Sequence, residues 1–142
     1  MFVLVTLLFL AAVASSIGRE RERLDDPSRW SKDKSAVAAD PKAIAKLIDD
    51  INAAVRTNKQ RMLSIITINT DVGATTLEQE KVRTGLSFGE VYVAHSLALA
   101  TRKKFDTIVV LKKSGQSWAQ IAKSHNVSLK GSSELIKEMQ KQ

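Results

Sequence analysis

The chain has 142 residues, a net charge of +7 and no cysteine. Its length favours one domain of ordinary size, and its 44% apolar and 26% charged residues are typical of a globular protein rather than a disordered or fibrous one. The lack of cysteine excludes disulfides, thiolate metal ligands, a cysteine nucleophile and a lipidated N-terminal cysteine.

Residues 1–16, MFVLVTLLFLAAVASS, form an apolar run that ends in small residues. Ala12-Val13-Ala14 fits the cleavage pattern of a secretory signal peptide and would make Ser15 the mature N-terminus. The run is shorter than the roughly 20 residues that a spanning helix needs. Because no Lys or Arg precedes it and RERER follows at residues 19–23, an uncleaved anchor or a buried helix of a cytosolic protein stays open. We expect export to the periplasm or medium after cleavage.

Residues 17–40 are charged, contain Pro27 and show no sustained period, so we expect a polar linker before a helical domain at residues 41–142. Asp40-Pro41 predicts the start of a helix, with the aspartate as N-cap and proline at the first helical position. The next apolar residues recur every three or four positions, which predicts one buried stripe made of Ile44, Leu47, Ile48, Ile51 and Val55.

Residues 62–68, Met-Leu-Ser-Ile-Ile-Thr-Ile, are ambiguous. Their β-branched residues and partial alternation indicate a strand. A single strand without a partner elsewhere in the chain would be marginal, however. We expect a helix that ends between Asn69 and Gly73, with a strand paired in an oligomer as the alternative.

The next two helices are predicted by their end signals. Thr75 or Thr76 is expected to cap a short helix that ends at Gly85, where glycine favours the left-handed conformation of a helix terminus. Ser87 and Glu90 have the spacing of a capping box. They open a helix over residues 88–101 that is apolar on most of its faces, so we expect it at the centre of the fold.

Cations at residues 102–104 close this central helix at its negative end. Asp106 is expected to cap the next helix, which stops at Gly115. Ser117 is expected to cap another helix, which stops where Asn126 adopts the left-handed conformation. A last helix is expected over residues 132–139.

The sequence thus predicts an all-α fold, a small multi-helix bundle with short Gly/Ser-capped turns and a helix–turn–helix-like C-terminal part. Residues 85–91 and 115–121 share a Gly-x-Ser-aromatic pattern at a spacing of thirty residues, and His95 aligns with His125. Two copies are too few for a stacked array, so we interpret the repeat as reuse of one helix–turn–helix solution.

Gly85-Leu86-Ser87-Phe88-Gly89 matches the G-x-S-x-G elbow of serine hydrolases, and Asp106 and His125 follow Ser87 in the chain order of those enzymes. The elbow requires a buried strand before the serine, whereas a charged helix is predicted there. Ser87 is sufficiently explained as an N-cap, so a hydrolase is the least favoured hypothesis and we expect no enzymatic activity.

Residues 121–128 resemble the turn of DNA-binding helix–turn–helix modules. The helix that would read the bases contains no Arg and two glutamates, Glu134 and Glu138, which disfavour contact with DNA. Export would also separate the protein from DNA. A DNA-binding module tethered to the membrane is therefore the second hypothesis.

His95 and His125 lie thirty residues apart without a carboxylate cluster beside them, so no metal site and no cofactor are expected. His95 lies on an apolar helix and is interpreted as a buried histidine with a hydrogen-bond partner. Asn126-Val127-Ser128 fits a glycosylation sequon, which matters only in a eukaryotic secretory pathway.

Part of the chain resembles small exported bacterial all-helical proteins of unknown function. The resemblance covers residues 84–127 and rests chiefly on the Gly-x-Ser-Trp-x-x-Ile-Ala-Lys segment at residues 115–123. It implies export and a helical fold, and it supplies no catalytic residues. Where those proteins often have glycine, this chain has Arg102, Ala119 and Asn126, so its turn geometry is in question.

The positive charge is concentrated in the C-terminal third. Residues 1–101 contain 13 Lys and Arg against 12 Asp and Glu, whereas residues 102–142 contain 9 against 3, a net of +6. A solvated face that keeps the protein soluble is the simpler explanation. Combined with export, it also suggests a structural or interaction module of the cell envelope that meets an anionic component or another protein. The expected anion-binding surface comprises Lys103, Lys104, Lys112, Lys113, Lys123 and Lys130.

Overall fold

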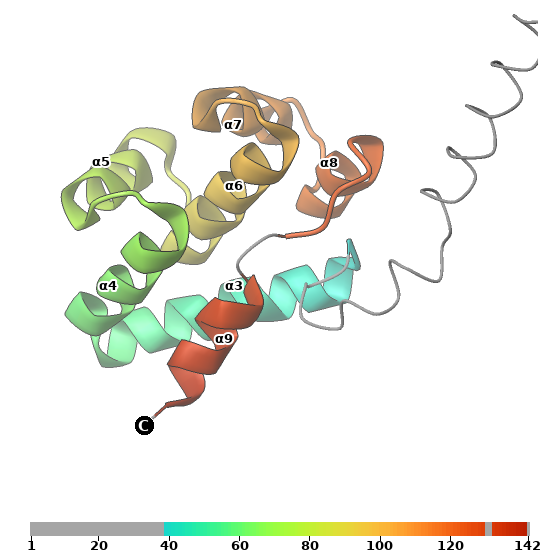
Figure 1. The fold of residues 1–142 in the computed structure, drawn as a ribbon. Helices are drawn as coiled ribbons and strands as arrows, with labels where there is room; N and C mark the ends of the chain where they lie inside the picture. The colour runs from blue at the N-terminus through green and yellow to red at the C-terminus, as the bar shows by residue number, and fades with distance from the viewer. Residues whose placement is uncertain (1–38, 130–131, 142) are drawn as a thin grey trace, which may run out of the picture. The chain divides into compact units, whose positions relative to one another are not determined.

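The computed structural model describes residues 39–129 and 132–141, and over these residues the fold is all-α, as predicted. The signal segment or anchor predicted at residues 1–16, and the linker predicted at residues 17–40 except its last two residues, lie outside this part. The helices are α3 (Pro41–Thr57), α4 (Lys59–Thr70), α5 (Ala74–Thr84), α6 (Phe88–Thr101), α7 (Phe105–Lys113), α8 (Trp118–Ser124) and α9 (Ser132–Gln140) (Figure 1).

Helix α6 forms the centre of the bundle, as its apolar composition predicts. Every residue from Phe88 to Ala98 except Glu90 is buried, and α3, α4, α5, α7 and α8 all pack against it (Figure 1). A helix that is apolar all round has no face to offer to water, so it must be enclosed by its neighbours.

Helix α3 begins as predicted. The Asp40 carboxylate accepts hydrogen bonds from the backbone N–H groups of Lys42 and Ala43, both at 3.3 Å, and Pro41 occupies the first helical position. The predicted stripe faces the core: Ile44, Leu47 and Ile51 are buried, and Ile48 and Val55 are half-buried.

Residues 62–68 lie within α4, so the helix expectation is confirmed and the strand alternative is wrong for this chain. α4 ends at Thr70 and is followed by Asp71 in the left-handed conformation, with φ 59°. Its buried residues lie on more than one face because α4 packs against α3, α5, α6 and α9. This burial on several sides explains why its sequence lacks a clear helical period.

The two predicted repeats have the same local structure. Gly85 and Gly115 have left-handed φ values of 73° and 108°. Ser87 and Ser117 each form a capping box with the residue three positions later, Glu90 in α6 and Gln120 in α8. The aromatic residues that follow the two serines, Phe88 and Trp118, are both buried.

Two of the predicted caps are wrong. α5 has Gly73 as its N-cap with no side-chain hydrogen bond, so Thr75 and Thr76 lie inside the helix. α7 has Lys104 as its N-cap, also without a side-chain hydrogen bond. The chain turns from α6 into α7 in only three residues, so α7 starts at Phe105 and Asp106 falls in its first turn.

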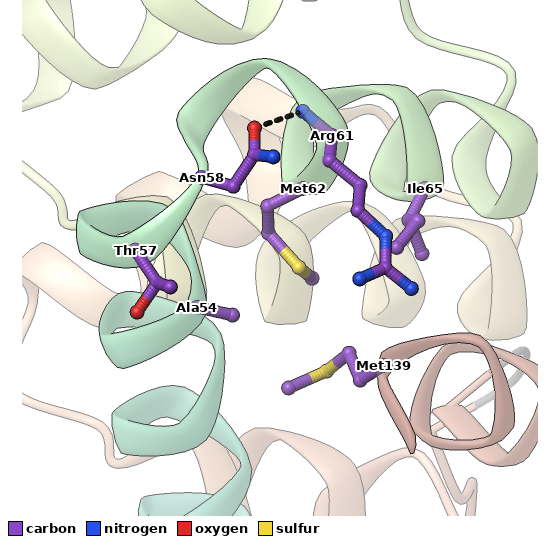
Figure 2. A pocket seen from close by; sticks show the side chains of 7 residues that line it. All are labelled: Ala54, Thr57, Asn58, Arg61, Met62, Ile65 and Met139. Atoms are coloured by element: carbon purple, nitrogen blue, oxygen red, sulfur yellow. Dashed lines mark hydrogen bonds between the residues drawn. The ribbon is translucent and has the colours of Figure 1, made fainter. Parts of the chain in front are cut away.

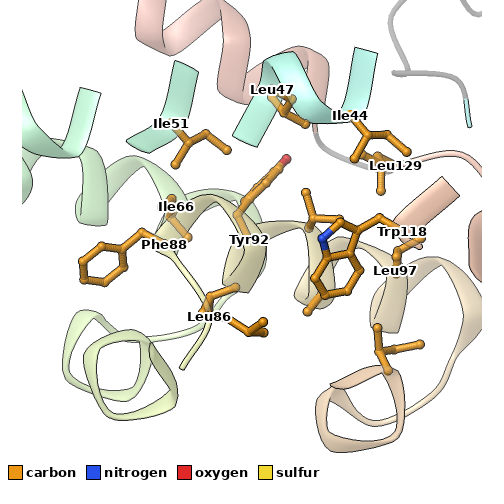
Figure 3. Packing of buried hydrophobic residues seen from close by; sticks show 14 of the residues in the cluster. Ile44, Leu47, Ile51, Ile66, Leu86, Phe88, Tyr92, Leu97, Trp118 and Leu129 are labelled. Carbon is orange, nitrogen blue, oxygen red and sulfur yellow. The ribbon is translucent and has the colours of Figure 1, made fainter. Parts of the chain in front are cut away.

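The core is aliphatic, with a few aromatic residues placed between helices. Tyr92 of α6 points toward α3 between Ile51 and Leu47 (Figure 3). Tyr92 Oη, Ser96 Oγ and Trp118 Nε1 are buried and have no hydrogen-bond partner among the residues that the structure describes.

Helices α3 and α6 cross in close contact at Gly89. A Cβ atom on Gly89 would lie 2.5 Å from the carbonyl oxygen of Ile48 and 2.8 Å from its Cα. At the same point Asn52 of α3 accepts a hydrogen bond from the backbone N–H of Gly89 at 2.9 Å and donates one to Ser87 Oγ at 3.2 Å. Asn52 therefore supplements the cap of α6 from a neighbouring helix.

Candidate functional site

Five of the six basic residues predicted to form an anion-binding surface are described, and they lie on three elements of the fold. Lys103 and Lys104 belong to the α6–α7 turn, which comprises residues 102–104, and Lys112 and Lys113 end α7. The nine residues of α7 separate the two pairs by roughly 13 Å along the helix axis. Lys123 lies on α8, which packs against α7, and Lys130 lies outside the described residues.

These cations have no acidic partner in the part of the chain that the structure describes. Residues 102–129 contain one acidic residue, Asp106, and its carboxylate pairs with Arg83 of α5 at 2.7 Å. Lys112 is half-buried, and its Nζ lies 5.2 Å from the centre of the Trp118 ring. The remaining predicted lysines with described side chains are exposed. Arg102, which is not among the predicted residues of this surface, is also exposed and has no acidic partner within the described residues.

The α6–α7 turn has an unusual electrostatic setting. Its cations complement the negative end of α6, as predicted, but they also precede the positive end of α7. Lys104 is the N-cap of α7, a position that normally carries Ser, Thr, Asp or Asn. Because the two helix ends have opposite signs, the net positive charge at this turn comes from its three cations.

A shallow groove opens beside this turn. It has a volume of about 560 Å³. Its cationic rim is the α6–α7 turn itself, and its apolar wall comes from α6, from the chain after α4 and from the first residue of α7. The lining residues are Thr70, Val72, His95, Ala98, Leu99, Arg102, Lys103, Lys104 and Phe105.

His95 forms part of the groove wall and is held on two sides. Its Nε2 lies 2.5 Å from Oε2 of Glu80 in α5, and its ring stacks on Phe105 with the ring centres 4.3 Å apart. Both side chains of the His95–Glu80 pair are largely buried. The prediction of a buried histidine with a partner is confirmed. Its partner, fifteen residues earlier in the chain, could not be predicted from the sequence.

The residues of the hydrolase hypothesis do not form a triad. Ser87 caps α6 and follows helix α5 rather than a strand. Asp106 pairs with Arg83. The Nδ1 atom of His125 lies 2.9 Å from the carbonyl oxygen of Ile121 in its own helix. The serine therefore lacks both a strained elbow and a base.

The C-terminal helices are arranged differently from a DNA-binding helix–turn–helix. α7 and α8 pack together across a short turn, but residues 125–131 lie between α8 and α9, and α9 packs chiefly on α4 (Figure 1). In such modules the recognition helix follows the first after a turn of about three to four residues. Asn126 has the predicted left-handed conformation, with φ 52°.

A second, smaller pocket of about 100 Å³ lies where α9 meets α3 and α4 (Figure 2). Met62 and Met139 lie at its centre, and Asn58 accepts a hydrogen bond from the backbone N–H of Arg61 at 3.1 Å. The Arg61 side chain donates to the backbone carbonyl groups of Glu138 and Lys141. This guanidinium therefore holds the end of α9 at the edge of the pocket.

No protein-family model, curated protein or solved structure matches this chain. Within the described residues, no group of three or more His, Cys, Asp or Glu side chains is placed to hold a metal ion. None of the described helices is long and apolar enough to cross a membrane.

Proposed function

We propose that this protein is a non-enzymatic interaction module of the cell envelope that binds an anionic partner through its basic surface. The surface comprises the α6–α7 turn, the end of α7 and Lys123. One observation carries the proposal: residues 102–129 hold six Lys and Arg against the single acidic residue Asp106, which is already paired with Arg83.

Charge balance elsewhere in the domain supports a specific role for this surface. Residues 40–85 hold seven Lys and Arg against six Asp and Glu, and two of those lysines form ion pairs with acidic partners, at 2.5 Å for Lys46–Asp50 and 2.8 Å for Lys59–Glu78. A purely solubilising charge would need no such segregation, because interspersed charges of both signs keep a surface soluble. Segregated charge raises the local potential and attracts polyanions.

Export is a separate part of the proposal. It is supported by the apolar run and the Ala-x-Ala pattern of residues 1–16 and by the resemblance to small exported bacterial proteins. Cell fractionation followed by N-terminal sequencing tests it: a soluble exported form that begins at Ser15 is expected. Recovery of an uncleaved chain in the membrane fraction would contradict it.

The surface is tested by retention on heparin and on vesicles with anionic headgroups at low salt. We expect Lys112→Glu/Lys113→Glu/Lys123→Glu to elute at clearly lower salt than the natural chain, because the reversed charges repel an anion that lies on this surface. Salt screens exposed charges beyond a Debye length of about 10 Å at 0.1 M, so the charges close to the bound anion decide its retention. The matched control is Lys42→Glu/Lys46→Glu/Arg56→Glu on α3, which changes the net charge equally at exposed positions. Equal retention of the natural chain and the first variant would refute the proposed binding surface. An equal loss of retention in both variants would mean that retention depends on net charge alone.

DNA binding has less support, because α9 packs on α4 and residues 125–131 separate it from α8. Gel shift with random duplex DNA, together with protease accessibility of the C-terminus in intact cells, separates the two proposals.

A further inference from the structure

The groove at the α6–α7 turn combines two kinds of surface that one ligand would cover together. Its rim is Arg102, Lys103 and Lys104, all exposed and without an acidic partner among the described residues. Its wall includes Leu99 and Phe105. Leu99 is a large apolar side chain with 51% of its surface exposed. The groove is shallow and has a volume of about 560 Å³.

The charges around the groove favour an anion. Glu80 contacts His95, whose ring forms part of the wall, and Asp106 pairs with Arg83, so neither carboxylate forms an ion pair with the cations of the rim. Asp71 lies between two lining residues but does not line the groove. The positive end of α7 and the negative end of α6 both meet the rim, so the three cations supply its net positive charge.

The apolar wall decides which kind of anion fits. A free inorganic anion would engage the rim and leave Leu99 in water. The Phe105 ring is held by its stacking on His95, so it offers a fixed apolar surface. A bilayer surface is flat and would contact the rim before the wall. A single hydrocarbon chain with one charged head covers both surfaces at once, because burying its methylenes against the wall is favourable.

We propose that this groove binds a single-chain anionic amphiphile. Its charged head lies among Arg102, Lys103 and Lys104, and its hydrocarbon chain lies along Leu99 and Phe105. The inference rests on the proposed anion binding, because its three cations belong to the basic surface, and it names a ligand class for one end of that surface.

The test is a titration of the isotope-labelled full chain with decanoate below its micelle concentration, followed by backbone amide shifts. Shifts are expected in residues 70–72 and 95–105. Acetate and decanol, which each present one half of the ligand, are expected to bind at least about tenfold more weakly. Equal shifts with acetate would mean that the cations alone account for binding, and equal shifts with decanol would mean that the apolar wall alone accounts for it. Binding to anionic vesicles without binding of monomeric decanoate would assign the rim to a membrane surface. Each of these three results overturns the proposal.

Three variants separate this site from the rest of the basic surface. Arg102→Gln/Lys103→Gln/Lys104→Gln is expected to weaken decanoate binding about tenfold or more, whereas Lys112→Gln/Lys113→Gln/Lys123→Gln leaves it unchanged. Leu99→Gln, at an exposed position, is expected to weaken decanoate several-fold and to leave heparin retention unchanged. If heparin retention persists but decanoate causes no shifts, the groove is refuted and the proposed function stands. If decanoate binds but heparin retention does not depend on the lysines, the proposed function fails alone.

Discussion

Replacing Gly89 with alanine tests the central contact of the fold. The added Cβ would lie 2.5 Å from the carbonyl oxygen and 3.0 Å from the carbonyl carbon of Ile48, so α3 and α6 must separate by a few tenths of an ångström or more. Overpacking of this kind costs about 1–3 kcal/mol. Separation would also weaken the hydrogen bond from the Gly89 N–H to Asn52, which contributes roughly 0.5–1.5 kcal/mol.

One effect opposes this loss. Alanine is favoured over glycine inside a helix by up to about 1 kcal/mol, although Gly89 is only the second residue of α6. The net expectation is a loss of about 2 kcal/mol in the free energy of unfolding, from the overpacking and hydrogen-bond costs less this gain. For a domain of this size the melting temperature falls by roughly 8–16 °C.

The assay is thermal and urea denaturation followed by circular dichroism, with Gly73→Ala as the matched control. Gly73 has an ordinary φ of −64° and open space around its Cβ position, so the same substitution there is expected to change stability by less than about 1 kcal/mol. Because the clash at Gly89 is with the backbone, adding Ile48→Ala should not rescue Gly89→Ala. Equal stability of the two alanine variants, or rescue by Ile48→Ala, would refute the reasoning.

Three further predictions use the same denaturation assay. Asn52→Ala is expected to cost about 1–3 kcal/mol because two hydrogen bonds to the start of α6 are lost, whereas Asn52→Asp keeps the acceptor for Gly89 and should cost less; an equal cost would refute the role of this acceptor. Arg102→Gly is expected to raise the free energy of unfolding by about 1 kcal/mol, because Arg102 has a left-handed φ of 57°. Ser114→Gly, at a residue with φ −74°, should lower it instead. Burial raises the pKa of Tyr92 to about 12, opposed in part by the nearby Ser96 hydroxyl, which does not reach hydrogen-bonding geometry with it. Because the unfolded chain then releases this proton at a lower pH than the folded chain, the free energy of unfolding should fall above about pH 10 by up to about 1.4 kcal/mol per pH unit, and Tyr92→Phe should remove that part of the fall. Phenolate absorbance of the native protein reports Tyr92 alone, since it is the only tyrosine. Titration at the ordinary pKa of 10.0 would contradict the prediction.

Features that depend on a few neighbouring residues could be predicted from the sequence. Asp40 and the two serine caps, Ser87 and Ser117, are signalled within four residues of the helix that each begins. Asn126 could be assigned a left-handed turn because asparagine tolerates this conformation. Arg102 adopts it too, although arginine has no such preference.

Features that depend on how helices meet could not be predicted. In the sequence, Gly89 stands out only as the last residue of a hydrolase motif, yet in the fold it lets the backbone of α3 approach. Asp106 is of a residue type that often caps helices, but the length of the α6–α7 turn decides where α7 starts. The groove beside this turn joins residues from three places in the sequence, and periodicity along one helix carries no information about such a juxtaposition.

The enclosure of α6 has a consequence for how the protein opens. Amide hydrogens in the middle of α6 become accessible to solvent only when the helices around it separate, so the free energy of opening that their deuterium exchange reports should equal the free energy of global unfolding. α9 packs chiefly on α4, and Arg61 binds its end. Because few other contacts hold α9, we expect it to detach while the rest of the domain stays folded. Exchange should therefore reveal two free energies of opening, a low one for α9 and a high one shared by α6 and the helices that surround it.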